Sequence, residues 1–112
     1  MTGRRSDAMR LSDMLRSMEH LEEILEAGFE PFSDSWVSQS AVIRELEIIG
    51  EAAGELSPAL RKQHADVKWE RMRGFSSFAK HEYWRIKPEL VWAAVEEMPS
   101  LRDRVRRIQL AP

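Results

Sequence analysis

The sequence predicts an all-α fold, a small antiparallel bundle of four to five helices. Apolar residues recur at spacings of three and four along several stretches, which is the pattern of amphipathic helices. No stretch is a convincing strand, and the prolines fall between the periodic stretches. Because 112 residues suffice for one hydrophobic core but not for two, we expect a single domain at 7–110 after a flexible tail at 1–6.

The first two helices are expected on either side of a polar connection. The first begins near Asp7 and ends at Gly28, with a stripe made of Leu11, Met14, Leu15, Met18, Leu21 and Leu25. Residues 29–35 are expected to form the connection, whose Ser/Asp cluster offers an N-cap for the second helix. That helix runs from about Trp36 to Gly54, with a stripe made of Val42, Leu46, Ile49, Ala53 and Leu56.

A third helix is predicted from Trp69 to about His81. Three residues of this stretch are expected to point inward, namely Met72, Phe75 and Ala79. Gly74 lies inside the helix at a cost of roughly 1 kcal/mol relative to alanine. We infer from this cost that Gly74 marks close contact with a neighbouring helix.

Prolines mark the remaining helix starts. Ser57 and Pro58 suit a cap and a first helical residue, so a short turn to about Gln63 is expected before a loop at 64–68. Pro88 forbids one continuous helix and begins a fourth, which runs to about Met98. The inward residues of this helix are expected to be Leu90, Val91, Ala94 and Val95. Pro99 then separates a last helical segment at 100–110.

Composition excludes several classes of protein. The chain has no cysteine, so it lacks disulfides, thiolate nucleophiles and cysteine-type zinc sites. Its three histidines lie far apart at 20, 64 and 81, so we expect neither a metal site nor a cofactor. No apolar run approaches the roughly 20 residues of a membrane span, and none follows the basic start as in a secretory signal. The expected location is cytoplasmic, with no membrane partner.

An aromatic and basic island lies between Trp69 and Trp92. It holds the only tyrosine and three of the four tryptophans. From Lys68 to Lys87 six Lys/Arg face two glutamates, which is a local charge of +4 in a chain whose net charge is −2. The remainder of the chain is therefore acidic. This island is where a polyanionic ligand such as RNA is expected to bind.

His81 is the residue of the island that is best suited to catalysis. A lone histidine in a helical protein is usually structural, and that interpretation stays open. If the helix ends near His81, however, His81 and Tyr83 can turn into one cleft beside cations. A histidine there can act as general acid or base on a phosphodiester. Trp84 could stack on a base, whereas Trp92 is expected in the core.

Several ordered segments resemble the HepT-like branch of the HEPN superfamily. They are Ala41–Ala53, Leu56-Ser-Pro, Trp69, Gly74-Phe-x-x-Phe-x-x-His81-Glu-Tyr83 and Leu90-Val-Trp92, and the resemblance extends from about Arg10 to Ile108. It implies an all-α HEPN fold, a homodimer, and a metal-independent endoribonuclease toxin. It also implies a small nucleotidyltransferase of the MNT type as the antitoxin partner.

The resemblance also implies roles for individual residues. The family motif is Arg, four to six residues, His, one residue, Tyr, and His81 and Tyr83 match its second half. Arg-Asn is usual five positions before the histidine, where this chain has Ser76 and Ser77, and Arg73 is separated from His81 by seven residues instead of four to six. We therefore expect His81 and Arg73 to be catalytic and Tyr83 to be the residue that the antitoxin adenylylates. RNA contacts are expected from Lys80, Arg85, Trp84, Ser76 and Ser77. The alternative is a non-catalytic dimer that keeps the partner interface and binds RNA or nucleotide.

Overall fold

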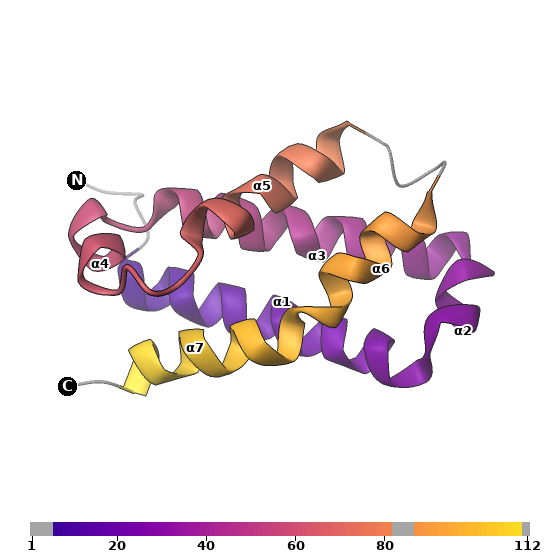
Figure 1. Ribbon diagram of the computed structural model, residues 1–112, viewed down its shortest axis with the longest axis horizontal. Helices are drawn as coiled ribbons and strands as arrows, with labels where there is room; N and C mark the ends of the chain where they lie inside the picture. Colours follow the sequence, from indigo (N-terminus) through magenta and orange to yellow (C-terminus); the bar gives the residue numbers. More distant parts are fainter. Residues whose placement is uncertain (1–5, 82–86, 111–112) are drawn as a thin grey trace.

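The computed structural model describes residues 6–81 and 87–110, and in these two ranges every regular element is an α-helix (Figure 1). The prediction of an all-α fold is therefore confirmed. The helices are α1 (Asp7–Ala27), α2 (Phe29–Ser33), α3 (Trp36–Glu55), α4 (Pro58–Gln63), α5 (Trp69–Lys80), α6 (Pro88–Glu96) and α7 (Met98–Leu110).

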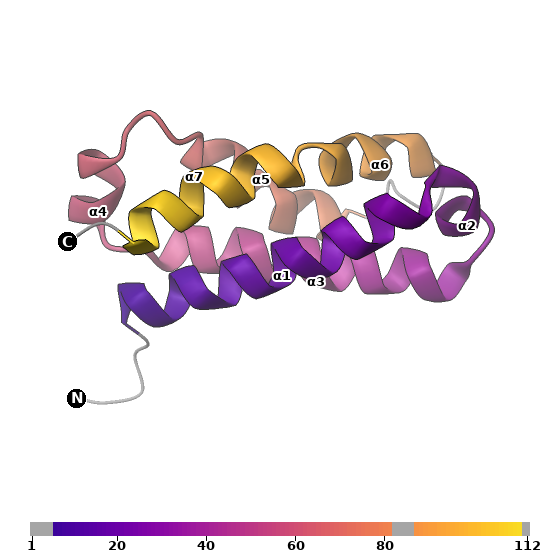
Figure 2. The same cartoon turned by 90° about the horizontal axis from the view of Figure 1, so that it is seen from below.

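The long helices run antiparallel along the same axis. In Figures 1 and 2, α1 and α3 lie side by side in opposite directions, and α5 runs back along α3. The pair α6 and α7 returns past α5 and α1. The bundle measures 42 × 25 × 22 Å along its principal axes. Among the described helices, none is long and apolar enough to cross a membrane.

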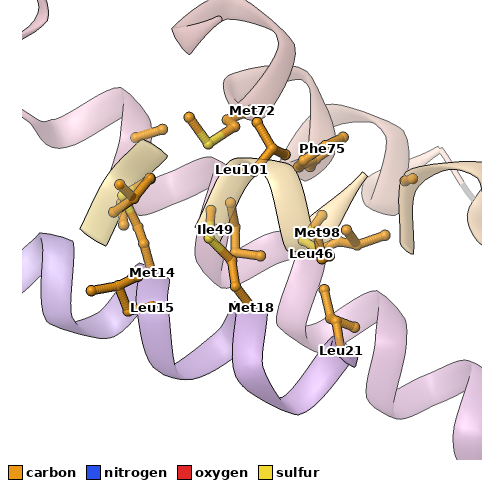
Figure 3. Packing of buried hydrophobic residues seen from close by; sticks show 14 of the residues in the cluster. Met14, Leu15, Met18, Leu21, Leu46, Ile49, Met72, Phe75, Met98 and Leu101 are labelled. Atoms are coloured by element: carbon orange, nitrogen blue, oxygen red, sulfur yellow. The ribbon is translucent and has the colours of Figure 1, made fainter. Parts of the chain in front are cut away.

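The core lies where these helices meet, and it is rich in methionine and leucine. Figure 3 shows side chains from α1, α3, α5 and α7 converging, among them Met14, Met18, Leu21, Leu46, Ile49, Met72, Phe75, Met98 and Leu101. The predicted stripes of the second and third helices are confirmed, since Val42, Leu46, Ile49, Met72 and Ala79 are all buried. The stripe of the first helix is buried from Leu11 to Leu21, whereas Leu25 is only partly buried. Leu90 was expected to point inward, but it is 49% exposed, because it lies on the outer side of the first turn of α6.

Local capping chemistry sets the helix ends. Gly28 ends α1 with φ of 99°, a conformation that side chains with a Cβ rarely adopt. The Ser35 hydroxyl accepts a hydrogen bond from the Ser38 amide at the start of α3, as the Ser/Asp cluster predicted. Ser57 caps α4 and also donates its hydroxyl hydrogen to Asp7 at 2.6 Å, which ties α4 to the start of α1.

The connection at 29–35 contains a helix that was not expected, the short α2. Phe29 and Phe32 of this helix pack against Trp92 of α6, with ring centroids 5.6 and 5.3 Å from the indole. Phe32 is fully buried. Tertiary packing of two aromatic rings therefore orders a segment whose proline and serines suggested only a loop.

Gly74 was expected to mark close helix contact, and this is wrong. A Cβ on Gly74 would meet no atom within 4 Å. The close contact belongs to Gly50 of α3 instead, where a Cβ would lie 2.5 Å from the Ser76 amide nitrogen and 3.0 Å from the Met72 carbonyl oxygen. Gly50 therefore lets α3 and α5 approach each other at Ser76.

Candidate nucleic-acid site on helix α5

His81 is exposed and occupies the C-cap of α5, one residue beyond Lys80. Its amide donates to the carbonyl oxygens of Ser77 and Phe78. Its Nδ1 lies 2.6 Å from the Ser77 carbonyl oxygen. Because a carbonyl oxygen can only accept, Nδ1 carries a proton, and Nε2 is the ring nitrogen that holds the lone pair in the neutral imidazole. The helix end thus fixes both the ring orientation and the tautomer of His81.

Ser76 faces α3, not His81. Its hydroxyl donates to the Arg73 carbonyl oxygen at 3.1 Å, and its backbone lies against Gly50. Ser77, the next residue, lies on the same helix face as His81 because the two are four residues apart. The two serines at the position of the usual Arg-Asn pair therefore point in different directions.

Arg73 is directed towards the beginning of α5. Its Nη1 lies 2.8 Å from a carboxylate oxygen of Glu70, and its side chain lies over Gly54 of α3. His81 is eight residues further on, which is about 12 Å along the helix axis. The structure therefore brings Arg73 together with Ser76 but does not bring Arg73 together with His81 within one chain.

Arg73 and Ser76 line an open groove of about 870 Å³ between α1, α3 and α5. Gly50 and Gly54 form part of its lining, and its charged residues are Arg10, Asp13, Glu51, Glu55, Glu70 and Arg73. The carboxylates outnumber the guanidinium groups there, four to two, so this groove does not attract a polyanion by charge alone. His81 is not among its lining residues.

The remaining predicted site residues divide into two groups. Lys80 is exposed, and as the last residue of α5 it is the cation next to His81 in the described chain. Tyr83, Trp84 and Arg85 lie outside the described residues. Within 6–81 and 87–110, no three His, Asp or Glu side chains are grouped so that they could hold a metal ion.

The sequence analysis did not identify two residues that shape the site, Glu70 and Gly50. Glu70 holds Arg73, and its position three residues earlier on the same helix was a detectable signal. Gly50 sets the distance between α3 and α5. The pair Gly50 and Gly54, four residues apart inside one helix, was the signal that could have identified it.

Comparison with known proteins places the chain in a family. The family model described as "Ribonuclease HepT-like" matches residues 14–108. A relative from Thermococcus cleftensis named "Probable ribonuclease HepT" is 32% identical over 108 residues, covering 95% of this chain and 98% of the relative. Another from Caldanaerobacter subterraneus subsp. tengcongensis, "Putative RNase TTE0752", is 33% identical, covering 88% of this chain and 89% of the relative. The comparison with solved structures gives no match. The chain belongs to the HepT-like ribonuclease family of the HEPN superfamily.

Proposed function

We propose that the chain is an endoribonuclease, the toxin of a HEPN/MNT toxin–antitoxin pair, and that it cleaves RNA without a metal ion. The observation that carries the proposal is the placement of His81. This histidine lies exposed at the end of α5, and its Nδ1 is held by the Ser77 carbonyl oxygen. The family membership and the names of the relatives support the same activity.

The proposed reaction uses the ribose 2′-hydroxyl as nucleophile. The hydroxyl oxygen attacks the adjacent phosphorus, and its proton passes to a general base. The P–O5′ bond breaks, and the leaving oxygen takes a proton from a general acid, so that a 2′,3′-cyclic phosphate and a 5′-hydroxyl result. Nε2 of His81 moves these protons, because Nδ1–H is occupied with Ser77. No metal ion is needed for this proton transfer.

A cation must stabilise the negative charge that develops on the phosphate oxygens. In the proposed site Lys80 or Arg73 takes this part in place of the motif arginine, whose position holds Ser76. Lys80 is adjacent to His81 in sequence, whereas Arg73 has to leave Glu70 to reach the phosphate from its own chain. The ion pair between Arg73 and Glu70 is exposed, so breaking it costs little, about 1 kcal/mol or less.

The proposed assembly is a homodimer with an RNA cleft formed by both protomers, controlled by an MNT-type nucleotidyltransferase. Trp36 and Val37 at the start of α3 are 77% and 58% exposed, and this apolar surface supports association. In this proposal Tyr83 is the residue that the partner adenylylates. An added phosphate next to Lys80 would occupy the position that RNA needs.

A non-catalytic dimer is the second candidate function. The observation that favours it is the separation of the two halves of the motif, because Ser76 cannot supply a charge and Arg73 is bound to Glu70. Such a dimer would keep the partner interface and bind RNA or nucleotide without cleaving it.

The deciding experiment is incubation of the purified protein with single-stranded RNA in the presence of EDTA. The proposal predicts cleavage products that end in a 2′,3′-cyclic phosphate, and their loss in His81→Ala. His20→Ala is the matched control, because His20 is also exposed but pairs with Glu45 on another part of the bundle. RNA that stays intact with the wild-type protein would favour the non-catalytic dimer, and equal cleavage by His81→Ala would refute the assignment of His81.

A further inference from the structure

The beginning of α5 and the short helix α4 line an open surface cavity of about 630 Å³. Its lining residues lie in α4, at the beginning of α5 and in the loop between them, whereas His81 is the C-cap at the other end of α5. Figure 1 shows α4 beside the beginning of α5. Val67 and Trp69, both buried, form its apolar side, and the indole nitrogen of Trp69 donates to the His64 carbonyl oxygen at 3.0 Å. This hydrogen bond fixes the ring, so the wall of the cavity is preformed.

The charged lining of this cavity is strongly positive. Four cations contribute to it, namely Arg61, Lys62, Lys68 and Arg71, against one carboxylate, Glu70. The local charge is therefore +3. The carboxylate is also 83% exposed and already paired with Arg73. Arg71 is paired with Glu97, a hydrogen bond that raises the pKa of Arg71 and keeps it charged.

The other three cations form no ion pair with any described residue. The Nε atom of Arg61 is buried, and it has no hydrogen-bond partner within the described chain. A phosphate group suits these donors, because its oxygens accept hydrogen bonds from guanidinium and ammonium groups at once.

A second hollow adjoins this cavity on the side that leads along α5 towards His81. A smaller cavity of about 260 Å³ between α5 and α6 shares Glu70 and Arg71 with it and extends to Phe78, one turn before His81. Gly74 lines the smaller cavity, and no atom lies within 4 Å of the position of its Cβ. A glycine that no packing contact requires lets a ligand approach the helix backbone closely.

We propose that the cavity between α4 and α5 is a second phosphate subsite, which binds the RNA backbone at a distance from the bond that is cut. This inference rests on the proposed ribonuclease function. The twelve residues of α5 separate the two sites by about 18 Å. At roughly 3.4 Å per nucleotide of a stacked strand, this corresponds to about five phosphates. Trp69 is too deeply buried to stack on a base, so the subsite contacts phosphates and not sequence.

The test compares two double variants that remove the same charge. Lys62→Gln/Lys68→Gln changes the subsite at two exposed side chains, and Arg16→Gln/Arg44→Gln is the control, since neither arginine lines the groove or either of the two cavities. Binding of a labelled 12-nucleotide RNA is measured by fluorescence anisotropy at several salt concentrations. Cleavage of the same RNA and of a trinucleotide, which is too short to reach both sites, is measured as kcat/KM.

The subsite variant is expected to bind the 12-nucleotide RNA more weakly. The slope of log affinity against log salt concentration should become shallower by about 1.4, which is roughly 0.7 for each phosphate that the variant no longer neutralises. Its kcat/KM is expected to fall for the long RNA and to stay unchanged for the trinucleotide.

Three other outcomes would each decide a different point. If the subsite variant binds and cleaves the long RNA as the control variant does, the subsite is refuted while the ribonuclease proposal stands. If RNA is bound but never cleaved, the ribonuclease proposal fails, and the change in salt dependence still decides the subsite. Loss of binding to the nucleotidyltransferase with unchanged RNA binding would assign the cavity to a protein partner and overturn the inference.

Discussion

The same substitution is expected to have opposite effects at two glycines on facing helices. Gly74→Ala places a methyl group in open space on α5, and Gly50→Ala places one against the backbone of Ser76. Both changes remove a glycine from a helix interior, so both carry the same intrinsic gain of about 1 kcal/mol in helix propensity. The difference between the two variants therefore reports the contact between α3 and α5.

For Gly74→Ala nothing opposes the propensity gain. We expect the variant to be more stable by about 1 kcal/mol, with a Tm higher by about 4–8 °C. For Gly50→Ala the new methyl carbon would lie 2.5 Å from the Ser76 nitrogen, and helix backbone cannot yield as a flexible side chain does. Overpacking of about 3 kcal/mol exceeds the propensity gain, so the expected net loss is about 2 kcal/mol. The two variants should then differ by about 3 kcal/mol, or about 12 °C or more in Tm.

Thermal and urea unfolding followed by far-UV circular dichroism measures both effects at one protein concentration. Equal concentration matters, because association would raise the apparent stability of every variant. If Gly50→Ala unfolds at or above the wild-type temperature, the close approach of α3 and α5 at Ser76 is wrong. If Gly74→Ala lowers the Tm, then Gly74 has a packing role that the structure does not show.

Three further predictions follow from the fold and the proposed assembly. Ser57→Ala removes the cap of α4 and a hydrogen bond to Asp7. The free energy of unfolding measured by urea titration should therefore fall by about 1–2 kcal/mol, and an unchanged value would contradict the role of this link. Light scattering at micromolar concentration should give twice the monomer mass, and a monomer there would remove the cleft formed by two protomers. Incubation with the nucleotidyltransferase and ATP should add AMP to the protein, and a mass gain that persists in Tyr83→Phe would disprove the assignment of that tyrosine.

Most helix positions were predictable because local chemistry determines them. Gly28, Ser35 and Ser57 act on residues three or four positions away, so the sequence alone indicates where helices begin and end. The break between the last two helices was expected at Pro99, but it lies at Glu97, and Pro99 is the second residue of α7, where a missing amide hydrogen costs no helix bond. The short helix α2 was not predictable in this way. It depends on contact between Phe29 and Trp92, which are far apart in the sequence.

The candidate site was predictable in part for the same reason. The end of α5 near His81 followed from Pro88, and the bond between His81 and Ser77 is local. Which glycine makes the helix contact depends on the rotation of α5 against α3, and local sequence patterns do not determine that rotation. The interpretation of Gly74 failed for this reason, and the cavity beside Arg61 was missed because its lining comes from two helices and a loop.

The most direct test of the central claim is the rate of RNA cleavage by Ser76→Arg in EDTA. Ser76 lines an open groove that His81 does not line, so a longer side chain has room there, and it would reach the phosphate only in the proposed cleft formed by two protomers. If His81 performs the proton transfer and the site lacks only a positioned cation, the substitution should raise the rate by about 10²–10³. Adding His81→Ala to the same chain should abolish that gain. If Ser76→Arg gives no gain while the wild-type protein cleaves strongly and Arg73→Ala destroys that activity, then Arg73 already supplies the cation. If none of these variants cleaves RNA, the proposed ribonuclease activity is contradicted.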